Sequence, residues 1–155
     1  GLPRTTLDVD LTIWVAEDRL QAFVASLVRT FPARTSDPVA FVKETRVLPL
    51  VTADGVQIDM IFGQLPYEQE AIQRAVRERI QGTEVRVCQP EDLVIHKLVS
   101  ERPRDREDVR GIIQQQAARL DRRYLDPKVA ALAHDLGRPD IAAWYEACWR
   151  EASRR

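Results

Sequence analysis

Apolar and polar residues alternate strictly in two short stretches of the chain, and this period of two predicts β-strands. In residues 7–13 every second position is apolar, and Asp8 and Asp10 lie between the apolar positions. In residues 56–62 the same alternation places Asp59 on the side away from the apolar residues. Side chains two positions apart lie on one face of a strand, about 6.5 Å from each other. If the two strands are neighbours in one sheet, the three carboxylates converge on a space the size of a metal ion.

The remaining hydrophobic pattern is mostly helical, because apolar residues recur every three or four positions. It predicts helices over residues 17–30, 67–80 and 106–120, a short one ending near Phe41, one opening at Pro90, and two beginning at Asp126-Pro127 and Arg138-Pro139. Asp54-Gly55 separates two β-rich runs, 47–52 and 56–62, and therefore predicts a hairpin. A further short strand is expected over residues 83–88, after Gly82 ends the preceding helix.

The order of these elements is strand, helix, hairpin, helix, strand and then helices, which predicts an α+β fold. We expect a small mixed β-sheet with helices packed on one face, followed by a helical C-terminal half. Residues 1–89 would form the α/β core, and residues 90–155 would form the helical part packed on it. A chain of 155 residues is long enough to bury such a core.

Composition narrows the functional classes only a little. The chain is 45% hydrophobic and 30% charged, with a formal net charge of -1, as in ordinary globular proteins. This charge gives no whole-chain argument for binding nucleic acid or an anionic membrane. No apolar run approaches membrane-spanning length, so we expect no membrane partner. Cys88 and Cys148 stand far apart, in no metal or redox spacing, and we expect both to be reduced and buried, as in a cytoplasmic protein.

The three aspartates allow two interpretations. Asp8, Asp10 and Asp59 could simply decorate the solvated face of an antiparallel sheet. Against this, aspartate is disfavoured in strands, and each of three acids at mid-strand would cost about 1 kcal/mol or more through repulsion and partial desolvation. A divalent cation bound between the carboxylates removes that repulsion. The pattern alone leaves both interpretations open.

Two groups of motifs carry a resemblance to a known family. The stretch Arg4-Thr5-Thr6-Leu7-Asp8-Val9-Asp10-Leu11, followed by the later strand with Asp59, resembles the nucleotidyltransferase-fold superfamily. The stretch from Gln89 to Leu98, followed by Arg102 to Val109, is similar to the AbiEii-type (type IV toxin) branch, in which a helix supplies a lysine and an Arg-x-Asp-x-x-Asp run follows it. The resemblance covers roughly residues 1–113.

The resemblance implies a set of site residues. Asp8, Asp10 and Asp59 would bind two Mg²⁺ (or Mn²⁺) ions, and Asp59 would also help to deprotonate the acceptor hydroxyl. Lys97 would place its charge on the β- and γ-phosphates of a nucleoside triphosphate, assisted by Arg4. Asp105 would lie near the cleft as a further catalytic candidate, supporting the groups that contact substrate.

Several of these residues have plainer interpretations. Lys97 could be an exposed helix lysine, and Arg4 a loop arginine in solvent. Asp105 could supply negative charge to a helix N-terminus or pair with Arg102 and Arg104. At the other end of the chain, four residues recur at helical spacing and are expected to pack in the core, with a subunit or antitoxin contact as the alternative. These are Trp144, Tyr145, Cys148 and Trp149.

The resemblance implies that the protein moves a nucleoside monophosphate from a nucleoside triphosphate to an acceptor and releases pyrophosphate. A toxin-like member would act on tRNA or protein and would have an antitoxin protein as partner. Two alternatives remain: a small-molecule acceptor of the aminoglycoside type, and an inactive module of the same fold that binds nucleotide, RNA or a partner protein. The family carries a Gly-Ser or Gly-Gly turn upstream of Asp-x-Asp, of which only Gly1 remains here, so we expect an upstream element outside this numbering.

Overall fold

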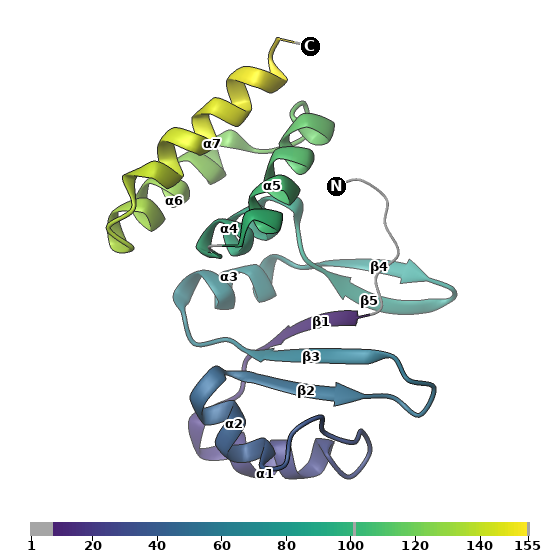
Figure 1. Ribbon diagram of the computed structural model, residues 1–155. Coiled ribbons are helices and arrows are strands. Elements are labelled where there is room, and N and C mark those ends of the chain that lie inside the picture. Colours follow the sequence, from purple (N-terminus) through teal and green to yellow (C-terminus); the bar gives the residue numbers. More distant parts are fainter. Residues whose placement is uncertain (1–7, 101, 155) are drawn as a thin grey trace. The chain divides into compact units, whose positions relative to one another are not determined.

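The computed structural model describes residues 8–100 and 102–154 (Figure 1). The described chain forms two compact units, one ending at Arg74 and the other beginning at Ala75. The first unit contains β1 (Asp8–Ile13), α1 (Glu17–Leu27), α2 (Pro38–Thr45), β2 (Val47–Val51), β3 (Gln57–Phe62) and α3 (Pro66–Arg74). The second contains β4 (Val76–Ile80), β5 (Thr83–Val87), α4 (Pro90–Val99), α5 (Pro103–Gln116), α6 (Arg122–Asp135) and α7 (Pro139–Ala152).

The strands of the first unit form a mixed sheet in the order β1-β3-β2 (Figure 1). β1 runs parallel to β3, whereas β2 runs antiparallel to β3. The tight connection between β2 and β3 uses Gly55 at φ 89°, a left-handed conformation that glycine adopts without a steric penalty. The predicted hairpin at Asp54-Gly55 is therefore confirmed, and β1 and the Asp59 strand are sheet neighbours, which was the condition for the three aspartates to share a face.

The apolar face of this sheet is covered by α1 and α2, which lie together beside β2 in Figure 1. Alternate residues of β2 and β3 turn inward to meet them, as the period of two requires. The buried members of this core are Val24, Val42, Leu48, Leu50, Met60 and Phe62. Helices thus pack on one face, which leaves the side chains of the other face outside this core.

Local signals set the ends of α2. The Asp37 side chain accepts a hydrogen bond from the Ala40 N–H at 3.0 Å, and Pro38 takes the first helical position. The helix continues past the end predicted near Phe41 and stops at Thr45, after which Arg46 adopts φ 64°. α1 stops earlier than predicted, at Leu27 rather than near residue 30.

The predicted helix over residues 67–80 is wrong in its second half. α3 ends at Arg74, and residues 76–80 form β4, which pairs antiparallel with β5. Gln81 and Gly82 both have positive φ, 49° and 84°, which is the conformation of a two-residue hairpin turn. Ile80 has the spacing of an apolar helix stripe, but it is 56% exposed. It therefore packs against no core that could stabilise a helix there.

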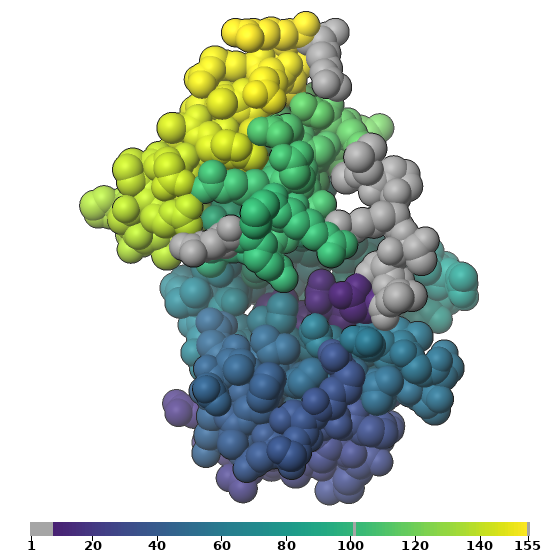
Figure 2. Space-filling view, viewed as in Figure 1, coloured from purple at the N-terminus to yellow at the C-terminus, as the bar shows by residue number. Residues whose placement is uncertain are grey.

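Helices α4 to α7 pack into one continuous body, coloured green to yellow in Figure 2. Its core includes Val94, Ile95, Leu98, Val109, Ile112, Ile113, Leu125, Val129, Ile141, Tyr145, Cys148 and Trp149. The predicted α+β class is confirmed: a small mixed sheet, a hairpin and a helical C-terminal half of four helices. The expected core packing of Tyr145, Cys148 and Trp149 is confirmed as well, whereas Trp144 is only half-buried, with the guanidinium groups of Arg106 and Arg110 over its ring.

Two helix starts were predicted too late. α5 begins at Pro103 rather than at residue 106, because Pro103 takes the first helical position instead of interrupting. α6 begins at Arg122, since the Asp121 side chain accepts hydrogen bonds from the N–H groups of Arg123 and Tyr124. Pro127, predicted to start that helix, lies inside it.

Two further observations concern solvent and membrane. Cys88 is exposed, which contradicts its predicted burial, while Cys148 is buried. Over the described part of the chain, we find no helix of the length and apolar character that crossing a membrane requires.

Candidate functional site

The three predicted metal ligands lie on one face of the mixed sheet. Asp10 of β1 is the register partner of Asp59 on β3, and residues directly opposite each other on adjacent strands point to the same side. Asp8 lies two positions before Asp10 in the same strand and therefore shares its face. Pro49 of β2 stands opposite Asp59 on the far side, so the row across the sheet runs Asp10, Asp59, Pro49.

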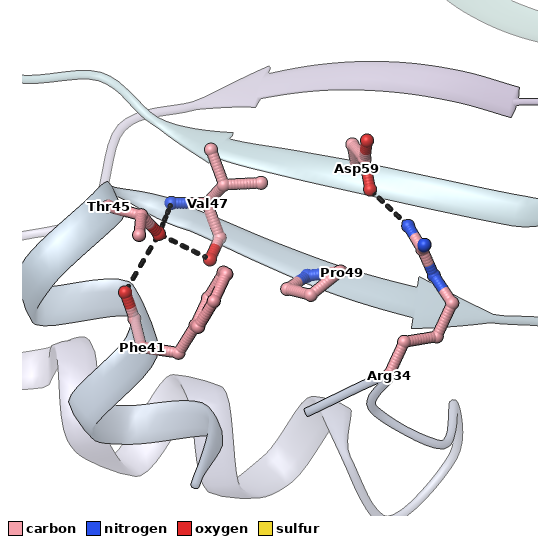
Figure 3. A pocket seen from close by; sticks show the side chains of 6 residues that line it. All are labelled: Arg34, Phe41, Thr45, Val47, Pro49 and Asp59. Atoms are coloured by element: carbon pink, nitrogen blue, oxygen red, sulfur yellow. Dashed lines mark hydrogen bonds and ion pairs between the residues drawn. The ribbon is translucent and has the colours of Figure 1, made fainter. Parts of the chain in front are cut away.

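Asp59 forms an ion pair with Arg34, a residue that the sequence did not single out. The Arg34 Nη2 group donates a hydrogen bond to Asp59 Oδ1 (Figure 3). The base of the arginine is fixed on β2, because its backbone N–H donates to the Pro49 carbonyl at 2.8 Å and its Nε donates to the Leu50 carbonyl at 3.2 Å. A local bridge between Ala33 and Leu50 brings this loop to β2.

An open depression of about 420 Å³ lies beside this pair. Its lining residues are Arg34, Phe41, Thr45, Val47, Pro49 and Asp59 (Figure 3). The Thr45 hydroxyl already donates to the Phe41 carbonyl at 2.8 Å and accepts from the Val47 N–H at 3.2 Å. The charges of the depression are therefore those of Arg34 and Asp59, set against an aromatic ring and a proline.

The aspartates suit magnesium in the kind of donor, since carboxylate oxygens are the hard ligands that this ion prefers. Among residues 8–100 and 102–154, however, no three His, Cys, Asp or Glu side chains gather closely enough to hold a metal ion. Asp59 instead directs an oxygen at Arg34. The backbone thus aligns the carboxylates, while the Arg34 contact occupies one of them.

The second unit brings together Lys97, Asp105 and Asp108. The Lys97 ammonium on α4 donates to Asp105 Oδ1 at 3.1 Å and to Asp108 Oδ2 at 2.7 Å, both on α5. Asp105 is buried and also accepts hydrogen bonds at 2.6 Å from the Ser100 hydroxyl and from the Arg102 Nε. Lys97 is therefore not an exposed helix lysine: its side chain is 20% exposed and is held by two carboxylates.

The surroundings of Asp105 keep it ionised. Desolvation by burial raises the pKa of its carboxyl. Hydrogen bonds from Ser100, Lys97 and Arg102 together lower the pKa by more than burial raises it, so the pKa lies below its usual range. The predicted pairing of Asp105 with Arg102 is confirmed, whereas Arg104 is exposed. Asp105 thus fixes the position of the Lys97 ammonium.

The predicted site residues fall into two sets. Asp8, Asp10 and Asp59 share a sheet face in the first unit, and Lys97 and Asp105 are in direct contact in the second. Arg4, the predicted triphosphate contact, lies outside the described residues. Arg34 was missed because it lies in a loop 25 residues away from Asp59, with no periodic or motif signal to connect the two.

Comparison with known proteins adds a family. No curated protein matches the sequence. Residues 40–138, more than half of the chain, match the family described as "Nucleotidyl transferase of unknown function (DUF2204)". The matched range contains Asp59, Lys97 and Asp105 and begins after Asp8 and Asp10. With the carboxylates of β1 and β3 aligned on one sheet face, the match leads to one conclusion: the chain belongs to this family of nucleotidyl transferases.

Proposed function

We propose that this protein is a Mg²⁺- or Mn²⁺-dependent nucleotidyltransferase that moves a nucleoside monophosphate from a nucleoside triphosphate to an acceptor, with release of pyrophosphate. Membership of a nucleotidyl transferase family implies the nucleoside triphosphate. The observation that carries the proposal is the register of Asp10 with Asp59 on adjacent parallel strands, with Asp8 on the same face. Carboxylates gathered on one sheet face repel one another, and a cation bound between them removes that repulsion.

The proposal gives the three aspartates separate tasks. Asp8 and Asp10 would hold the metal from β1. Asp59 would hold it from β3 and take the proton of the acceptor hydroxyl. A bound divalent ion would supply positive charge to neutralise the charge that develops on the transferred phosphoryl group.

In the second unit we assign the triphosphate contact to Lys97, with Asp105 as its positioning residue. Two carboxylates restrict the ammonium to one place, which lowers the entropy cost of presenting it to a phosphate. Lys97→Met should then raise the KM for the nucleoside triphosphate more than it lowers kcat. A fall in kcat with an unchanged KM would remove Lys97 from substrate binding.

For the acceptor we propose RNA of the tRNA type or a protein, in the toxin-like manner of the AbiEii-type branch, with an antitoxin as partner. Both motif groups of the AbiEii resemblance lie within this chain, and the second lies within the family match. Cys88 and Cys148, the two cysteines of the chain, form no disulfide with each other, which agrees with a reducing compartment, so we place the reaction in the cytoplasm.

Pyrophosphate release tests the enzyme directly. The protein is incubated with each of the four ribonucleoside triphosphates, Mg²⁺ or Mn²⁺ and total RNA or protein as acceptor, and pyrophosphate is measured. We expect metal-dependent release that Asp10→Asn abolishes and that Asp18→Asn, an equal charge change at an exposed helix residue, leaves intact. Metal and nucleotide that raise the melting temperature without any release would instead identify an inactive binding module.

A further inference from the structure

We propose that Arg34 is a positioning residue that holds the Asp59 carboxylate while no nucleotide is bound, and then exchanges it for a phosphate of the incoming nucleotide. Asp59 would become a full metal ligand only after this exchange. The inference rests on the proposed function, because it concerns the same metal site. It adds to that function an explanation of why binding of nucleotide would strengthen binding of metal.

The contacts of Arg34 allow such an exchange. Its backbone N–H and its Nε are tied to the carbonyls of Pro49 and Leu50, which keeps the base of the side chain on β2. The bond to Asp59 comes from the terminal Nη2, beyond these two anchors (Figure 3). Because the guanidinium is one rigid plane, turning Nη2 away from Asp59 also turns Nε away from the Leu50 carbonyl, while the backbone bond to Pro49 keeps the loop in place.

The surroundings favour a phosphate as the new partner. Of the six described residues that line the depression, only Arg34 and Asp59 are charged. The pair is partly open to solvent, with side-chain exposures of 33% for Arg34 and 38% for Asp59, so an anion can reach the guanidinium from the depression. The planar donors of arginine suit phosphate oxygens as well as they suit a carboxylate.

The energetic scale also fits an exchange. A partly exposed ion pair typically changes an equilibrium constant by about fivefold or less, so it does not lock Asp59 permanently. While the pair is intact, a cation must compete with Arg34 for the Asp59 carboxylate. Once a phosphate holds Arg34, this competition ends, and binding of nucleotide strengthens binding of metal.

Arg34→Gln separates this inference from a general structural defect, because it should move two affinities in opposite directions. Mn²⁺ binding without nucleotide, measured by the electron paramagnetic resonance signal of free Mn²⁺, should tighten by about fivefold. Binding of a non-hydrolysable nucleoside triphosphate at saturating Mg²⁺ should weaken by about tenfold. Arg29→Gln, the same change at an exposed residue of the same unit, should move neither, and Arg34→Lys should recover part of the nucleotide affinity.

A second pair of variants shows whether Arg34 acts through Asp59. In the Asp59→Asn background, Arg34→Gln should no longer tighten Mn²⁺ binding. If Asp59→Asn weakens Mn²⁺ binding but Arg34→Gln leaves it unchanged or weakens it, the exchange is overturned and the proposed metal site stands. If Asp59→Asn itself leaves Mn²⁺ binding unchanged, the metal site of the proposed function fails, and the exchange fails with it.

Discussion

Asp10 stands directly opposite Asp59 on the neighbouring parallel strand, so two carboxylates of separate strands share one position on one sheet face. Like charges placed opposite each other in a sheet are destabilising. In this structure the ion pair of Asp59 with Arg34 offsets part of that repulsion. In the proposed function, a bound cation would remove the rest of it.

Removing the charge of Asp10 should leave the fold intact or make it more stable. We expect Asp10→Ala to abolish transfer while the free energy of unfolding rises by up to about 1 kcal/mol, because the repulsion with Asp59 is relieved. Thermal and urea unfolding in metal-free buffer measure this change. A variant that fails to fold would mean that Asp10 has a structural task, and would count against the site.

Lys97 should contribute to stability as well as to function. Lys97→Met removes one hydrogen-bond donor from the buried Asp105 and another from Asp108. We expect the free energy of unfolding to fall by about 1–3 kcal/mol. Arg104→Gln, an exposed charge change in the same segment, should alter it by less than about 0.5 kcal/mol. Equal losses in the two urea titrations would contradict the ion-pair geometry.

Acid should weaken the first unit through Glu68, which is buried at the start of α3. Burial raises the pKa of its carboxyl. Hydrogen bonds from the Leu65 and Gln64 N–H groups and from Arg46 together lower it by more than burial raises it, so the pKa lies below its ordinary 4.5. A carboxyl with a lowered pKa in the folded state stabilises the fold above its unfolded pKa, and this contribution is lost as the pH falls through the folded pKa. Stability should therefore be constant above about pH 5 and fall below about pH 4.5.

Glu68→Gln tests this pH dependence. At pH 7 it should cost about 1–3 kcal/mol, since Arg46 keeps a weaker partner, and it should reduce the loss of stability between pH 5 and pH 3. Glu44→Gln, at an exposed residue of α2, should reproduce the wild-type pH profile. An unchanged acid profile in Glu68→Gln would assign the acid sensitivity to other carboxyls.

The β4–β5 turn should respond to changes in its two central residues. Gly82 has φ 84°, so Gly82→Ala should destabilise the chain by about 1 kcal/mol. Gln81 has φ 49°, where asparagine is better tolerated, so Gln81→Asn should stabilise it by a few tenths of a kcal/mol. Thermal unfolding measures both. Stabilisation by Gly82→Ala would show that residues 76–87 do not form this hairpin.

The alternating pattern around Asp10 and Asp59 was sufficient to predict both strands and the side of each strand on which its acids lie, and Asp54-Gly55 was sufficient to predict the hairpin. The same kind of reasoning failed over residues 75–80. The spacing of Ala75, Val76 and Ile80 fits the period of a helix, although the segment forms a strand. Gln81-Gly82 is also a weaker turn signal than Asn-Gly or Asp-Gly. Pairing with β5 decided the outcome, and a partner strand cannot be read from one segment alone.

The candidate site shows the same division. The aspartates could be selected from sequence because acids are rare at mid-strand. The contact of Lys97 with Asp105 could not be derived from spacing, since eight residues and a helix boundary separate the two. Arg34 gave no signal at all, because its importance comes only from a bridge that places its loop beside β2.

The sequence by itself determined the periodic elements and the side of each strand on which the acids lie, because both follow from the local geometry of the backbone. Only the tertiary structure decided which strands are neighbours, which residue stands opposite Asp10, and which basic side chain forms the ion pair with Asp59. These are contacts between residues distant in the chain, and their free energies depend on burial and charge that no single segment contains.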